Sequence, residues 1–139
     1  MTHEEQLSLV HQHYALGLAG NQIAARELLT DDFQITIPYF MPFGGTYRSK
    51  DAFRELIPIV LKALAIRKID HIATTVGEGY AMGLVEFTLE GHDGQPLAVA
   101  EVIKFRDNKI CEIRPYYYDP FPMIKMAEQR SQKVTMKSD

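Results

Sequence analysis

The stretch from Pro96 to Phe121 constrains the fold of this chain more than any other. Apolar residues recur at every second position on both sides of Asp107-Asn108, a pattern typical of two β-strands joined by a tight turn. The chain must therefore build a sheet around a long hairpin, and one face of that sheet is apolar enough to need covering.

One carboxylate lies on the apolar face of this predicted hairpin. Because successive strand residues point to opposite faces, Glu101 shares its face with apolar neighbours on both strands. The inward set is Val99, Glu101, Ile103 and Phe105, then Cys111, Ile113, Pro115 and Tyr117, ending at Asp119. The outward set includes Val102, Ile110, Glu112, Arg114, Tyr116 and Tyr118. A carboxylate on an apolar face is costly unless it has a partner or takes up a proton, so the pattern indicates a pocket.

The composition is that of one globular domain. The chain has 139 residues, 46% hydrophobic and 24% charged, enough for a single core without disulfides. A net charge of −3 argues against binding nucleic acid or an anionic membrane. The single cysteine, Cys111, has no partner for an internal disulfide, and the amino terminus lacks a signal-peptide pattern. We therefore predict a cytoplasmic location, with no membrane and no nucleic acid as partner.

Helical patterns precede most of the strands. Thr2 and Glu5 have the spacing of a capping box at the start of a first helix, and Asn21 can cap a short second one that ends at Asp31-Asp32. A third helix with an apolar stripe is predicted after Ser49, which would cap it, with a kink or a new turn at Pro58.

Extended segments fill the rest of the chain. Strands are predicted over Phe33–Ile37, Ile66–Val76 and Tyr80–Glu90, in addition to the two of the hairpin. The loop from Pro38 to Gly45 carries large apolar side chains and is a candidate lid. A short helix is predicted over Met123–Gln129.

This order of elements predicts an α+β fold. We expect a cone-shaped, curved antiparallel sheet wrapped around helices, with a cavity inside. One domain would cover residues 1–130, and the polar segment 131–139 would be a flexible tail.

Three segments resemble a known superfamily: LLTDDFQITIP, FGGTYRSKDAF and EVIKFRDNKICEIRPYYYD. The chain is similar to the SnoaL-like and ketosteroid-isomerase-like members of the nuclear transport factor two-like superfamily, which also contains scytalone dehydratase and limonene epoxide hydrolase. The resemblance implies the cystatin-like α+β barrel of that superfamily. Because this scaffold carries many chemistries and also plain binding modules, it does not imply one reaction.

The resemblance places individual residues. The isomerase's general base falls on Ile37, which cannot move a proton, so steroid isomerisation is not expected. Its oxyanion-binding acid, a carboxyl that apolar surroundings keep neutral, aligns with Glu101. The isomerase's partner tyrosine aligns with His13, next to Tyr14. The terminal aspartate of limonene epoxide hydrolase maps to Asp119, whereas that enzyme's other two site residues fall near Val85 and Phe87.

The candidate catalytic residues are Glu101, Asp119, His13 and Tyr14. If His13 or Tyr14 reaches Glu101, the pair can share a proton; if neither does, burial should keep the Glu101 carboxyl neutral. Asp119 precedes a proline, where an aspartate also serves as a turn residue. The candidate ligand-binding residues are Leu18, Ile37, Tyr39, Phe53, Ile57, Phe87, Ile113 and Tyr117, with His71 on a strand whose facing the pattern leaves open. His11 and His13 point in different directions on a helix, so no metal site is predicted. No cofactor is predicted either.

Two functions remain open at this point. One is a cofactor-independent isomerase, cyclase, dehydratase or hydrolase that acts by acid–base chemistry on an apolar carbonyl or hydroxyl compound. The other is a non-catalytic module of the same fold that binds a ligand or dimerises. The outward residues Val102, Ile110, Tyr116 and Tyr118 predict a homodimer through the outer face of the sheet.

Overall fold

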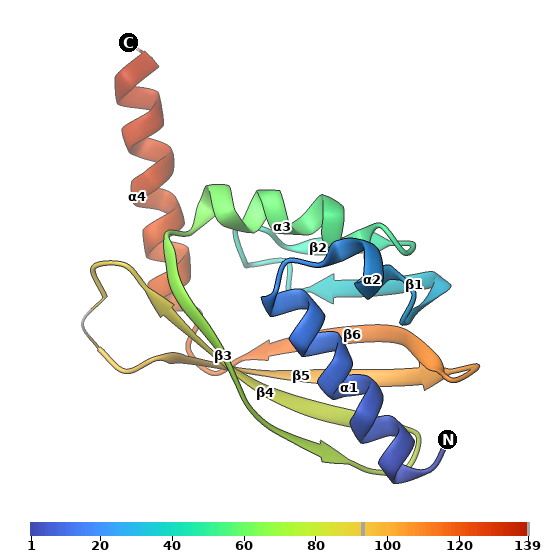
Figure 1. Ribbon diagram of the computed structural model, residues 1–139. Helices are drawn as coiled ribbons and strands as arrows, with labels where there is room; N and C mark the ends of the chain where they lie inside the picture. The colour runs from blue at the N-terminus through green and yellow to red at the C-terminus, as the bar shows by residue number, and fades with distance from the viewer. Residues whose placement is uncertain (93, 139) are drawn as a thin grey trace.

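A computed structural model describes residues 1–92 and 94–138, with side chains described up to residue 133. It has the predicted α+β fold: a curved sheet that stays open, covered by helices (Figure 1). The helices are α1 (His3–Leu18), α2 (Gln22–Arg26), α3 (Ala52–Ala63) and α4 (Phe121–Ser138). The strands are β1 (Leu29–Ile37), β2 (Gly45–Arg48), β3 (Ile66–Val76), β4 (Tyr80–Leu89), β5 (Leu97–Arg106) and β6 (Lys109–Tyr117).

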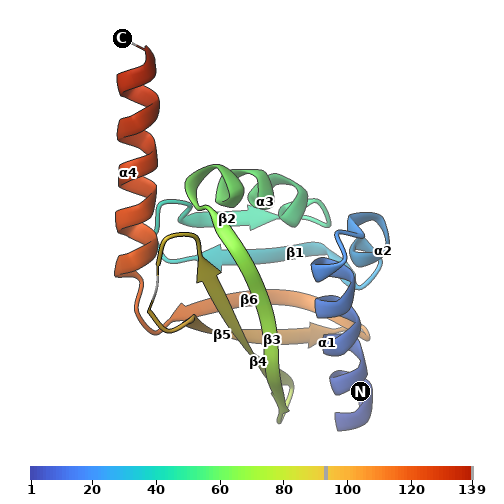
Figure 2. The same cartoon turned by 60° about the vertical axis from the view of Figure 1, so that its left-hand side comes forward.

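The sheet has the strand order β2-β1-β6-β5-β4-β3. All neighbours pair antiparallel except β1 and β6, which are parallel. Helix α1 packs across β3 and β4, while α3 packs on β2 and β1. Both views show the bent sheet curving beneath these helices, so the inner face of β5 and β6 lies under them (Figures 1 and 2).

The hairpin that dominates the sequence forms at the predicted turn. Asp107 and Asn108 have φ angles of 54° and 61°, and Arg106 pairs with Lys109 across them. A two-residue turn with both central residues left-handed matches the twist of the strands that it joins. On the inner face Val99 and Ile103 are 2% and 0% exposed, which agrees with the predicted facing of β5.

The facing of Ile110 was predicted wrongly. Lys104 pairs with Glu112 but Phe105 pairs with Ile110, so Cys111 is an extra residue that bulges out of β6. The bulge shifts the alternation by one residue and turns Ile110 inward, where it is 0% exposed and pairs with Leu29 of β1. Ile110 therefore does not belong to the outer surface.

The first two helices begin where the sequence predicts. Thr2 and Glu5 form the capping box, with distances of 3.0 and 3.1 Å between each side-chain oxygen and the backbone nitrogen of the other residue. Asn21 Oδ1 accepts the Ala24 N–H at 3.2 Å. Helix α2 is shorter than predicted, because Asp31-Asp32 lies within β1.

Helix α3 begins later than predicted. Ser49 has a φ of 78° and its Oγ accepts the N–H of Asp51 at 3.1 Å, whereas Asp51 is the N-cap residue. The short strand β2, which the sequence analysis did not predict, occupies the residues just before this turn. Pro58 lies inside α3, which continues to Ala63.

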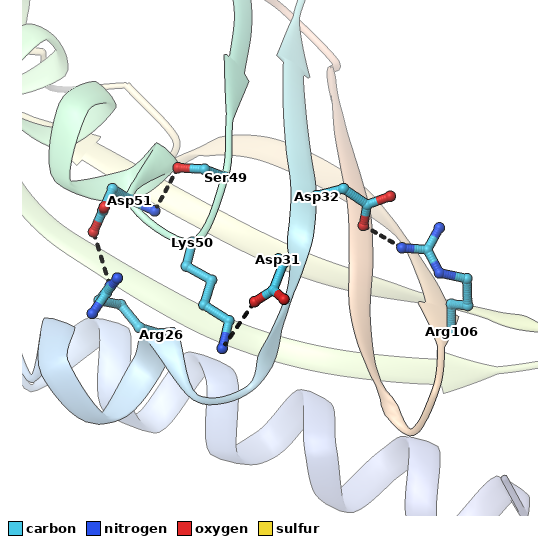
Figure 3. Close-up of polar contacts among 7 residues, drawn as sticks. All are labelled: Arg26, Asp31, Asp32, Ser49, Lys50, Asp51 and Arg106. Carbon is cyan, nitrogen blue, oxygen red and sulfur yellow. Dashed lines mark hydrogen bonds and ion pairs between the residues drawn. The ribbon is translucent and has the colours of Figure 1, made fainter.

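Three ion pairs lie around this turn and the hairpin (Figure 3). Arg26 Nε is 2.8 Å from Asp51 Oδ1 and Lys50 Nζ is 3.5 Å from Asp31 Oδ1, while Arg106 pairs with Asp32. They link α2 to the start of α3 and the β5–β6 turn to β1. Because most of these side chains are well exposed, each pair contributes only modestly to stability.

The carboxyl-terminal segment is more helical than predicted. Helix α4 covers the predicted Met123–Gln129 and continues through Ser138, and its far end extends away from the sheet (Figures 1 and 2). Met123 anchors its first turn in the core with 0% exposure. The last residue of the predicted tail, Asp139, lies outside the described residues.

Candidate functional site

A hydrogen bond between α1 and β5 lies at the centre of the candidate site. The hydroxyl of Tyr14 donates a hydrogen bond to Glu101 Oε1, with 2.8 Å between the two oxygen atoms. Tyr14 is 8% exposed and Glu101 is half-buried, so the bond is formed largely out of water. Of the two helix residues predicted as partners of Glu101, Tyr14 makes this bond.

Gly83 makes room for the bond. It pairs with Glu101 across the β4–β5 ladder and is buried. A Cβ built on Gly83 would lie 2.1 Å from the Tyr14 hydroxyl oxygen and 2.7 Å from two ring carbons. Only glycine lets the tyrosine lie this close to the strand. A glycine inside a strand often marks such a close approach of another group. The sequence analysis did not identify this residue.

His71 supports the ring of Tyr14 from β3. The two rings stack with centroids 4.2 Å apart and an interplanar angle of 17°. A 2.7 Å hydrogen bond joins His71 Nε2 to Thr74 Oγ1, and the ring of His11 lies edge-on at 5.8 Å. The facing of His71, which the sequence left open, is thus toward α1.

His13 is buried on another side of α1. Its ring lies 5.5 Å from Phe53 of α3 and 5.1 Å from Tyr14. It is 9% exposed, and among the described residues no hydrogen-bond partner reaches its Nδ1. Burial, with a smaller contribution from the charge of His71, lowers the pKa of His13 to about 4, so the ring is neutral at pH 7.

The electrostatics of the pair favour uncharged forms. Burial raises the pKa of Glu101, and the hydrogen bond from Tyr14 opposes this with a smaller effect. Burial also raises the pKa of Tyr14, as do the charge of Glu101 and the hydrogen bond to it. A carboxyl with a raised pKa can exchange a proton nearer to neutral pH than an ordinary glutamate can.

Asp119 is placed as a turn residue. It is exposed, and its Oδ1 accepts the N–H of Phe121 at 3.2 Å, at the start of α4. This contact matches the alternative that the sequence had offered for an aspartate before a proline.

The candidate ligand-binding residues divide into two groups. Ile37 and Ile113 are 4% and 0% exposed in the core, while Phe53, Ile57, Phe87 and Tyr117 are half-buried. Leu18 and Tyr39, in contrast, are 52% and 92% exposed and do not line the interior. Leu18 is the last residue of α1, and Tyr39 follows Pro38 and lies against the ring of Phe40.

A groove of the surface lies elsewhere. This groove of about 1000 Å³ runs between α3 and α4 and is lined by Phe40, Pro42, Ile59, Lys62, Ala63, Ile124, Ala127, Glu128, Arg130, Ser131, Gln132 and Lys133. None of the predicted site residues lines it. We assign the candidate site to the Tyr14–Glu101 pair, because two titratable groups in contact inside the fold are a stronger sign of chemistry than volume alone.

The described residues hold neither a metal-binding cluster nor a membrane-spanning helix. They contain no cluster of three or more histidine, cysteine or acidic side chains arranged to hold a metal ion. Among the same residues, no helix is both long and apolar enough to cross a membrane.

Comparison with known proteins gives one family. The model of the SnoaL-like domain matches residues 10–113. No curated protein matches this chain.

Solved structures share the fold. Bal32a from a soil-derived mobile gene cassette is 16% identical, with a TM-score of 0.77 over 89% of this chain and 97% of that one. An NTF2-like protein from Burkholderia xenovorans is 16% identical, with a TM-score of 0.73 over 91% and 98%. A protein with a cystatin-like fold from Methylobium petroleophilum is 15% identical, with a TM-score of 0.71 over 86% and 80%.

Gly83→Ala should displace Tyr14 and weaken its bond to Glu101. A rigid buried ring cannot move away freely from a Cβ at 2.1 Å, so we expect a loss of roughly 1 to 3 kcal/mol in the free energy of unfolding, measured by urea denaturation. Gly17→Ala in α1 is the control, because its Cβ meets nothing within 4 Å and should be neutral or stabilising. Equal stability of the two variants would contradict this account.

His13 should make the fold sensitive to acid. Its folded pKa of about 4 is below the ordinary 6.5, so its stabilising contribution is present above pH 6.5 and is lost as the pH falls toward 4. Relative to His13→Phe, the wild type should lose on the order of 3 kcal/mol of unfolding free energy between pH 7 and pH 4. Thermal denaturation across this range tests it, with exposed His3→Gln as the control. Parallel curves for the wild type and His13→Phe would refute the prediction.

Proposed function

Because the chain belongs to the SnoaL-like domain family, we propose that it binds a small, largely apolar organic molecule between α1 and the inner face of the sheet. The ligand carries a carbonyl or a hydroxyl group, which meets Glu101. The observation that carries this proposal is the 2.8 Å hydrogen bond from Tyr14 to Glu101, which is formed largely out of water and beside the stacked ring of His71.

The proposed activity is proton transfer without a cofactor. One oxygen of Glu101 accepts from Tyr14, which leaves the other for a ligand. Burial raises the pKa of this carboxyl and so suits it to give or take a proton near neutral pH. Isomerisation, cyclisation, dehydration and hydrolysis all use such a step.

A second candidate function is ligand binding or dimerisation without catalysis. Two features favour it: the position of the isomerase's general base is the apolar Ile37, and the carboxylate of Asp119 is exposed in a turn. In this alternative, the Tyr14–Glu101 pair would orient a ligand without transferring a proton to it.

The proposal includes self-association through the outer face of the sheet. Met82, Leu84 and Tyr116 are 45%, 37% and 56% exposed there, on the face opposite to α1 and α3. The neighbouring outward residues carry both charges, such as Lys104 and the pair Glu112–Arg114. A mixed-charge surface can face its own copy without net repulsion, which suits a two-fold dimer. The location proposed is the cytoplasm, where Cys111 would stay a thiol.

Glu101→Gln tests the chemical part of the proposal. The amide keeps the shape and an acceptor oxygen for Tyr14 but cannot titrate, so the fold should persist while ligand binding or turnover changes. Carboxyl-carbon NMR of the wild type should give Glu101 a pKa above the ordinary glutamate value. A normal pKa together with unchanged binding of small ketones in the variant would exclude Glu101 from a functional site.

Sedimentation at micromolar concentration tests the dimer. We expect twice the 15.8 kDa mass of the chain, and Tyr116→Glu should shift the protein to the monomer by placing like charges across the two-fold axis. Ile23→Glu is the control, because Ile23 is 83% exposed on α2, outside the outer face. A wild type that sediments only at 15.8 kDa would rule the dimer out.

A further inference from the structure

The groove between α3 and α4 is apolar over half of its lining. Both helices contribute pairs of apolar residues one turn apart, and the loop after β1 adds two more; the six are Phe40, Pro42, Ile59, Ala63, Ile124 and Ala127. Phe40 and Ile59 are 49% and 40% exposed, so the chain alone leaves apolar surface of the groove in contact with water. Its volume of about 1000 Å³ is large enough for a small organic ligand.

The charged residues that line the groove are mainly cations. Lys62, Arg130 and Lys133 are basic and Glu128 is acidic, although the chain as a whole has a net charge of −3. Among the described residues, none of the three cations forms an ion pair with a carboxylate. The groove therefore attracts an anion, and Glu128 favours a single negative charge over a multiply charged head group.

The cations lie at one end of the groove. Along α4, positions three residues apart share a face, and this face changes from Ile124 and Ala127 to Arg130 and Lys133. The apolar part lies near the sheet, and the basic part lies toward the far end of the helix, which extends away from the sheet (Figures 1 and 2). From Ile124 to Lys133 the face is about 14 Å long. A ligand that matches it has an apolar chain and one anionic end.

Arg130 is held in place at the junction of the two parts. Its Nε donates a hydrogen bond to the backbone oxygen of Lys62 across 3.1 Å, in the last turn of α3. The carbonyls of a last helical turn have no partner inside their own helix, so this bond also caps α3 and ties it to α4. The bond uses Nε and neither of the two Nη atoms, which carry N–H groups in the geometry that suits a carboxylate.

We propose that this groove binds a free carboxylic acid with an apolar chain of medium length. The carboxylate contacts Arg130 between Lys62 and Lys133, and the chain lies along Ile124 and Ala127 against α3. This is a second site, separate from the Tyr14–Glu101 pair, and it does not depend on the function proposed for that pair.

Isothermal titration calorimetry with decanoate, below the concentration at which it forms micelles, tests the site. We expect saturable binding of one molecule per chain, and binding of uncharged 1-decanol that is at least about tenfold weaker. Arg130→Gln should weaken decanoate binding by about tenfold, but it also removes the bond to α3. Lys62→Gln keeps that backbone bond and should weaken binding by about threefold. Lys125→Gln is the matched control, because Lys125 is exposed on α4 and does not line the groove.

The position of binding is read from the backbone amide NMR signals, which should shift at Ala63 and Ala127 when decanoate is added. An absence of saturable binding, equal affinity for 1-decanol, or an equal loss in Lys125→Gln and Lys62→Gln would overturn the inference. Shifts gathered around Tyr14 and Glu101 would also overturn it, and would place the acid at the other site. If dilution of the protein shifts the groove signals and decanoate does not, a second copy of the chain occupies the groove, and the inference is wrong.

Discussion

The hydrogen bond from Tyr14 to Glu101 is the contact on which the interior of this protein depends. It joins the first helix to the centre of the sheet, across 87 positions of sequence, and it satisfies a carboxylate on an otherwise apolar face. Without it Glu101 would lose hydration with no replacement, which in a partly buried site costs more than an ordinary hydrogen bond gains. The bond therefore stabilises the fold at the point where the candidate site lies.

Much of the surrounding structure can be understood as support for this contact. Gly83 lets the ring approach β4, and His71 covers the ring from β3, held in turn by Thr74. His13 occupies the space toward α3 as a neutral side chain. Three elements thus fix one phenol from different sides, which is the arrangement that a preorganised site requires.

The fold and the acidic centre of the site could be predicted because each rests on local pattern. Period-two alternation placed Glu101 inward, and the Asp107-Asn108 turn set the hairpin. Ile110 could not be placed, because a single-residue bulge at Cys111 reverses the alternation of β6. The apolar alternation in the sequence does not show where such a bulge lies. Tyr39 was misplaced for a related reason: an apolar side chain in a loop does not tell which way the loop folds. The choice between His13 and Tyr14 depended on a helix rotation that only packing on β3 and β4 decides.

The balance of charge around the pair also limits what the site can accept. The titratable side chains that contact Tyr14 include Glu101, His13 and His71, and burial lowers the pKa of both histidines. None of them supplies a permanent cation, so an ionised Glu101 is stabilised mainly by the hydroxyl of Tyr14. An anionic ligand would add a second negative charge to a partly dry interior, where like charges repel strongly. A neutral ligand avoids this electrostatic cost. If a reaction places negative charge on an oxygen atom of that ligand, a hydrogen-bond donor such as a tyrosine hydroxyl must stabilise the charged oxygen.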